Sequence, residues 1–262
     1  MASMASTTKT HFKNCLTSSA LRSYLAEFIS TFFYVFSAVG SIISSRKLTP
    51  DAESDPTTLV ATAAAQAFAY SVSVYMAAEA SGGHVNPAVT FGLAVGGHVT
   101  IPTAIFYWAV QLVGATLACL LLRVATTGQA IPTTAIAPEM TGFGGAVLEG
   151  VVTFVLVYTV YAAGDARKLT SYDLLDETGL VVVALAHGFA LFVTVYMAVN
   201  ISGGHVNPAV TFAMVIGGHV SVPTGIFYWL AQLLGSTMSC LVWMLMTSGH
   251  VLLNHFIQFY TM

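Results

Sequence analysis

The sequence has little charge. Asp, Glu, Lys and Arg make up 7% of its 262 residues, whereas 56% are hydrophobic. Soluble domains carry roughly a quarter charged residues, so this chain cannot cover a water-facing surface. The low charge therefore excludes a soluble globular enzyme and a disordered protein. With a net charge of −3 the chain also has no basic surface for a phosphate backbone, and no nucleic-acid partner is expected.

Cysteine is scarce as well. The three cysteines, Cys15, Cys119 and Cys240, do not suggest a disulfide framework. Cys119 and Cys240 lie inside apolar runs and are interpreted as small hydrophobic residues. The Ser, His and Asp residues show no nucleophile pattern and no catalytic constellation. We therefore predict no enzyme activity, no catalytic residue, no cofactor and no metal.

What the chain does have is long apolar runs. A bilayer core of roughly 30 Å needs about 20 apolar residues per helical span. Six runs predict such spans: Tyr24–Ile43, Thr58–Ala78, Thr103–Val124, Ala146–Ala163, Leu180–Val199 and Thr224–Met246. The Lys and Arg residues of the loops weakly favour the cytosolic side for both termini. The expected fold is an all-α, multi-pass protein embedded in a lipid bilayer.

An internal repeat dominates the sequence. Ser81–Phe91 reads SGGHVNPAVTF, and Ser202–Phe212 repeats it 121 positions later. Each half would hold three spans, an odd number, so the second half is expected to cross the membrane inverted. The predicted segments are a cytosolic N-terminal segment (1–23), a first repeat (24–125), a connecting loop (126–145), a second repeat (146–246) and a C-terminal tail (247–262).

A short helix is expected inside each repeated segment. Asn followed by Pro is a strong helix-start signal, and Asn86-Pro87 and Asn207-Pro208 both provide it. Paired glycines close each helix after about nine residues, roughly 13 Å, which reaches only halfway into the core. Two such half-helices would meet N-terminus to N-terminus near the midplane. Their positive ends would repel cations and admit neutral solutes.

These residues carry a family resemblance. The duplicated boxes Asn86-Pro87-Ala88 and Asn207-Pro208-Ala209, each after Ser-Gly-Gly-His-Val, resemble those of the major intrinsic protein (aquaporin) family. The leader Ala26-Glu27-Phe28-Ile29-Ser30-Thr31 is similar to that of plant tonoplast intrinsic proteins, although the second half resembles the family's first half. The resemblance implies six transmembrane helices with two re-entrant half-helices, and a homotetramer in the vacuolar membrane. It also implies passive transport of water and small neutral solutes such as urea, glycerol, ammonia or hydrogen peroxide.

The resemblance also implies a selectivity filter. Its positions fall on Gln66, 20 residues before the first Asn, on Gly204, three before the second, and on Val210, directly after the second box. For the fifth helix, the internal repeat places His187 opposite Gln66. Because Gly204 and Val210 are small and apolar, we expect a wide filter with little selectivity for water.

Other polar and aromatic residues allow more than one interpretation. Glu27 and Glu149 lie within apolar runs and are either proton-relay groups or buried acceptors for loop N–H groups. The second role is favoured because re-entrant loops need partners. His84 and His205 are expected to shape the loops rather than to bind metal. The repeated motif that ends in Trp108 and Trp229 opens two spans and is interpreted as an interfacial anchor.

Two alternatives to a passive channel remain open at this point. A proton-coupled secondary transporter is also built from inverted repeats, and it would need titratable groups along the path. A recombined family member that conducts nothing is the other alternative, because the second half copies the first.

Overall fold

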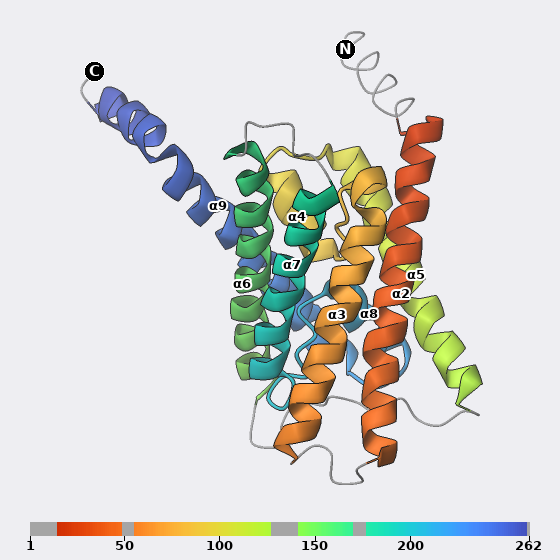
Figure 1. Ribbon diagram of the computed structural model, residues 1–262. Coiled ribbons are helices and arrows are strands. Elements are labelled where there is room, and N and C mark those ends of the chain that lie inside the picture. The colour runs from red at the N-terminus through yellow and green to blue at the C-terminus, as the bar shows by residue number, and fades with distance from the viewer. Residues whose placement is uncertain (1–14, 49–54, 127–140, 170–176, 261–262) are drawn as a thin grey trace.

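The computed structural model describes residues 15–48, 55–126, 141–169 and 177–260, which hold eight helices and no strand (Figure 1). These helices are α2 (Ser18–Leu48), α3 (Pro56–Ser81), α4 (Pro87–Val95), α5 (Ile101–Ala125), α6 (Gly142–Leu169), α7 (Glu177–Ala198), α8 (Pro208–Ile216) and α9 (Val222–Tyr260).

Six helices among the described residues are long and apolar enough to cross a membrane. They are α2, α3, α5, α6, α7 and α9, and they contain the six predicted spans almost entirely. Several extend past the apolar runs at one or both ends. In particular, α9 continues to Tyr260, well beyond the predicted span that ends at Met246.

The N-terminus of α3 shows how a span begins in this chain. Asp55 is the N-cap, and its carboxylate accepts hydrogen bonds from the Thr58 backbone N–H at 2.8 Å and from the Thr58 hydroxyl at 2.5 Å. These bonds lower the pKa of Asp55. Pro56 occupies the first helical position, where its missing N–H costs nothing. The helix therefore has a fixed start.

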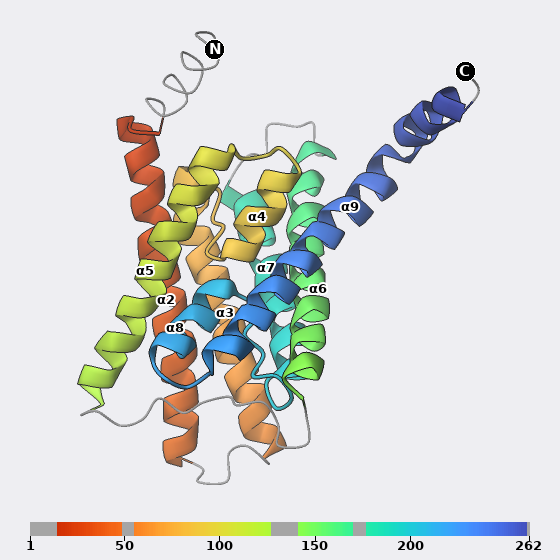
Figure 2. The same ribbon diagram turned by 180° about the vertical axis from the view of Figure 1, so that it is seen from behind.

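The two halves are inverted relative to each other. The start of α2 and the end of α9 lie at the same end of the bundle, and α4 and α8 lie in opposite halves of it (Figures 1 and 2). Within the halves, α2 packs on α3 and α5, while α6 packs on α7 and α9. Between the halves, α3 packs on α7, α4 on α9 and α5 on α8. The predicted inverted fold is confirmed.

Glycine sets the closest helix crossings. Gly188 of α7 lies directly against α3, where an added Cβ would collide with Ser71 Oγ and would lie 2.7 Å from the Ala67 carbonyl oxygen. Gly114 of α5 lies equally close to α2, with the Phe28 carbonyl oxygen 2.7 Å from an added Cβ. Small residues permit such approaches between membrane helices. Since Gly188 has no room for a side chain, it fixes the register of α3 against α7.

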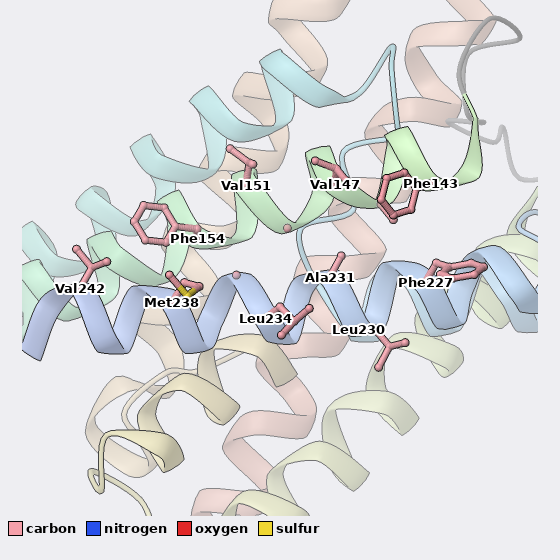
Figure 3. A pocket seen from close by; sticks show the side chains of 13 residues that line it. Phe143, Val147, Val151, Phe154, Phe227, Leu230, Ala231, Leu234, Met238 and Val242 are labelled. Carbon is pink, nitrogen blue, oxygen red and sulfur yellow. The ribbon is translucent and has the colours of Figure 1, made fainter.

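An apolar groove of about 680 Å³ lies between α6 and α9 (Figure 3). It is lined by Phe143, Ala146, Val147, Gly150, Val151, Phe154, Phe227, Leu230, Ala231, Leu234, Gly235, Met238 and Val242. In the first repeat the counterparts of Ala146 and Gly150 are Tyr24 and Phe28. Tyr24 stacks on Phe106 with ring centroids 5.0 Å apart. Ala146 and Gly150 have small side chains at these two positions and leave space in the groove.

Candidate functional site: two re-entrant loops and the half-helices between them

Each half-helix is reached by a short non-helical segment. The backbone of Gly82 takes φ +93° and ends α3, donating its N–H to the Ala78 carbonyl at 2.9 Å. Gly83 follows at φ +66°, and an added Cβ there would lie 2.6 Å from the Val74 carbonyl oxygen. Only glycine fits this combination of positive φ and close packing. Gly203 and Gly204 have the same left-handed backbone in the second repeat.

The two Asn side chains hold the half-helices together at their N-termini. Asn86 accepts from the Ala88 N–H, and Asn207 accepts from the Ala209 N–H, each at 2.8 Å. Each side chain also reaches across to the other repeat. Asn86 Nδ2 donates to the Val206 carbonyl at 3.0 Å, and Asn207 Nδ2 donates to the Val85 carbonyl at 3.1 Å.

Glu27 is fully buried and accepts four hydrogen bonds from the end of α3, the first re-entrant segment and α5. One carboxylate oxygen accepts from Ser81 Oγ at 2.6 Å and from the His84 N–H at 2.8 Å. The other accepts from the Val85 N–H and from Gln111 Nε2, both at 2.8 Å. The Glu27 carboxylate thus ties the first re-entrant segment to α2 and α5.

Glu149 repeats the arrangement in the second half. Its carboxylate accepts from Ser202 Oγ at 2.7 Å, from the His205 and Val206 N–H groups at 2.9 and 2.7 Å, and from Gln232 Nε2 at 3.0 Å. Val206 has φ +55° and its counterpart Val85 has φ +56°. A β-branched residue in this region costs on the order of 1–3 kcal/mol. The carboxylates bond to the N–H groups of both strained residues.

His84 and His205, two residues before each Asn-Pro-Ala box, pack within the re-entrant loops. His84 Nδ1 lies 3.0 Å from Thr90 Oγ1, and His205 Nδ1 lies 3.0 Å from Thr211 Oγ1. Their rings meet Tyr107 and Tyr228 edge to face, with centroids 5.0 and 5.4 Å apart. In the described part of the chain no group of three metal-ligating side chains surrounds them.

The interpretation of Trp108 and Trp229 as interfacial anchors is wrong. Trp108 Nε1 donates to the Pro87 carbonyl and Trp229 Nε1 to the Pro208 carbonyl, each at 2.9 Å. Both indole groups therefore hold the starts of the half-helices, and both side chains are half-buried. The sequence signal that could have shown this is their fixed separation of 21 residues from the box prolines in both repeats.

Gln111 and Gln232 were not singled out from the sequence. Both are fully buried, and each donates through Nε2 to the buried Glu of its repeat. Each also donates to a threonine of the half-helix, Thr90 or Thr211. They stand at equivalent positions of apolar runs in the two repeats. A repeated polar residue in a membrane span was therefore the available signal.

The predicted filter residues are all buried in the bundle. Gln66 is 6% exposed, His187 5% and Val210 9%, and Gly204 is buried with φ +59°. His187 Nδ1 lies 2.6 Å from the Val183 carbonyl of its own helix.

The helix register separates two of these residues. Gly188 meets α3 between Ala67 and Ser71, and the two helices run in opposite directions. Gln66 and His187 therefore differ in depth by about four residues, roughly 6 Å at 1.5 Å per residue. This differs from the expectation that they lie opposite each other.

Two half-helices that meet N-terminus to N-terminus inside an inverted six-helix bundle define a membrane channel. The sequence model of one family, described as "Major intrinsic protein", matches residues 14–175 and 169–261. The chain belongs to the major intrinsic protein family. It is a channel for water and small solutes and not an enzyme.

Similar proteins agree with this membership. The chain is 49% identical over 233 residues to "Probable aquaporin TIP5-1" of Oryza sativa subsp. japonica, covering 88% of this chain and 86% of that one. It is 47% identical over 234 residues to "Probable aquaporin TIP5-1" of Arabidopsis thaliana, covering 88% and 87%. Among solved structures, the aquaglyceroporin from Plasmodium falciparum superposes with a TM-score of 0.65 at 18% identity, over 84% of this chain and 93% of that one, and it shows the same fold.

Proposed function

We propose that each subunit carries water and small neutral solutes, including urea, glycerol, ammonia and hydrogen peroxide, along a path between the two Asn-Pro-Ala boxes. The observation that supports this path is the pair of cross-repeat bonds, Asn86 to Val206 and Asn207 to Val85. These bonds bring the ends of both half-helices to one point inside the bundle. A side-chain NH₂ has two hydrogens, so each Asn keeps a second donor for a passing solute.

The charge at this point favours neutral solutes. A helix N-terminus carries roughly +0.5 of an elementary charge, so two facing ends sum to about one. At about 4 Å and an effective dielectric constant of about 20, that charge repels a monovalent cation by about 4 kcal/mol. Water, urea and glycerol have no net charge and avoid this barrier.

The proposed filter beside α8 combines Gln66 with Gly204 and Val210. Gly204 has no side chain, and Val210 brings no charge and little length. An opening with these residues has room for solutes larger than water. The proposed native form is a homotetramer in the vacuolar membrane, a location that the TIP names of the relatives support.

Stopped-flow measurements on proteoliposomes test the proposal. Vesicles that contain the purified protein should take up water, urea and glycerol faster than protein-free vesicles, at rates that do not change when a pH gradient is imposed. Light scattering of the purified protein should give the mass of four chains. Solute uptake that depends on a proton gradient, or no uptake by well-folded protein, would contradict the proposal.

A further inference from the structure

We propose that the pore contains two polar constrictions in series, one formed around Gln66 in the α8 half and the other around His187 in the α4 half. This inference rests on the proposed function, because it assigns residues to the same solute path. It separates two side chains that the expected selectivity filter placed together.

The first support is the symmetry of the α3–α7 contact. Ala67 and Gly188 occupy equivalent positions of the repeat, 121 residues apart, and the structure brings them into direct contact. Two equivalent positions touch only close to the pseudo-two-fold axis that relates the halves. That axis lies in the membrane plane in an inverted repeat. Gln66 and His187, each one residue earlier, therefore lie on opposite sides of the axis.

The second support is the contact between α3 and the first re-entrant loop. Gly188 is level with the α3 residues between Ala67 and Ser71, so His187 is level with about Tyr70. The Tyr70 hydroxyl donates to the His84 carbonyl at 3.3 Å, which ties this level of α3 to the loop before α4. His187 thus lies at the depth of the first loop, and Gln66 lies toward the second.

The third support is the direction of the side chains. On α7, His187 belongs to a buried stripe with Val183, Leu191 and Thr194, whereas Phe189 and Val193 are exposed on the outer face. Gln66 lies in the matching stripe of α3, with Phe68 and Val72 on the outer face. Both side chains therefore point into the bundle, where the half-helices run.

The repeat supplies the partners of each constriction. Gln66 lies in the same half as Gly204 and Val210. The positions equivalent to these two are Gly83 and Val89, and they lie in the half that holds His187. A solute would meet an amide in one constriction and an imidazole in the other, with a glycine and a valine of a re-entrant segment in the same half. Since the constrictions act in series, their resistances to flow add.

Sided labelling of single cysteine variants tests the arrangement. Gln66→Cys and His187→Cys are placed in vesicles of one orientation, and a membrane-impermeant cationic thiosulfonate is added to one side at a time. The reagent cannot pass the positive centre. It should block most water flux through His187→Cys from the side that holds the start of α2, and through Gln66→Cys from the opposite side.

The parent protein is the control, since its cysteines at 15, 119 and 240 are buried and its flux should not change. Val89→Cys and Val210→Cys repeat the test in the same halves if a first variant does not fold. Mass spectrometry reads the same sidedness without any flux. Reaction of both cysteines from the same side would overturn the inference even if water flux supports the channel. If the unlabelled parent protein carries no water, the proposed channel path is contradicted. The sidedness of labelling read by mass spectrometry still tests the two constrictions in that case.

Discussion

The indole rings of Trp108 and Trp229 meet edge to face, with centroids 6.2 Å apart and an angle of 68° between their planes. Each ring comes from a different repeat and donates to the box proline of its own half-helix. The pair therefore connects the N-termini of the two half-helices through side chains of α5 and α9.

Trp108→Phe and Trp229→Phe should each destabilise the protein. Phe keeps an aromatic ring but has no N–H, so a buried proline carbonyl loses its donor, at a cost of about 1–3 kcal/mol. Thermal unfolding in detergent should show a lower midpoint for each variant. The double variant should depart from additivity, because the two rings are in contact. Single variants that melt with the parent would show that these bonds contribute nothing.

Glu27→Gln should lower stability less than Glu27→Leu. Gln retains one acceptor oxygen but presents an NH₂ group where the carboxylate received two donors. Leu leaves the His84 and Val85 N–H groups and one Gln111 hydrogen without an acceptor, whereas the Ser81 hydroxyl can still donate to the Ala77 carbonyl. Each buried donor left unpaired costs about 1–3 kcal/mol. Thermal unfolding in detergent should give a lower midpoint for Glu27→Gln than for the parent, and a still lower one for Glu27→Leu.

Water flux per folded channel should change little in Glu27→Gln, because the carboxylate serves the loop. Glu149→Gln provides the matched variant in the other repeat, and it should behave alike. Complete loss of flux in a well-expressed Gln variant would instead favour the proton-relay role.

Asn86→Asp combined with Asn207→Asp should raise cation conductance. Up to two negative charges would then face the positive half-helix ends and offset their repulsion. The matched control is Asn86→Ala with Asn207→Ala, which removes the same cross-repeat donors without adding charge. Conductance of K⁺ in planar bilayers is the measurement. Equal conductance of the two double variants would end the electrostatic explanation of cation exclusion.

Val210→Arg should strongly reduce urea and glycerol flux while reducing water flux less. Arg adds a long side chain with a permanent charge and five donors, so it narrows the opening and adds a cationic barrier. Val210→Met is the matched control, because it adds length without charge. Flux is compared per folded tetramer, since burial of the charge is expected to cost stability. A variant with the parent's ratio of the three fluxes would show that Val210 lies outside the narrow part of the path.

The six spans and both half-helices could be predicted because their signals are local. An apolar run of about 20 residues and an Asn-Pro helix start need no knowledge of distant residues. The role of Trp108 could not be obtained this way. A Trp near the start of a span fits a membrane interface as well as an interior donor, and only the position of the Pro87 carbonyl decides between them.

The register of α3 against α7 was equally inaccessible. Equivalent residues in a repeat share a pattern, but an inverted repeat sends them to opposite depths unless they lie on the axis. Gly188 decides this for Gln66 and His187, because its missing side chain sets how the helices cross. The sequence repeat alone does not give the depth of either residue in the membrane.

The exchanged bonds of Asn86 and Asn207 also bear on the biosynthesis of the chain. The donor of Asn86 and the carbonyl of Val85 both find their partners in residues more than a hundred positions later. While the ribosome is still making the second half, the first loop has no protein partner for either group at the membrane centre. The Glu27 bonds to the first loop lie within the first repeat and can form earlier, whereas the bonds of Asn86 and Val85 can form only after the second loop has been inserted.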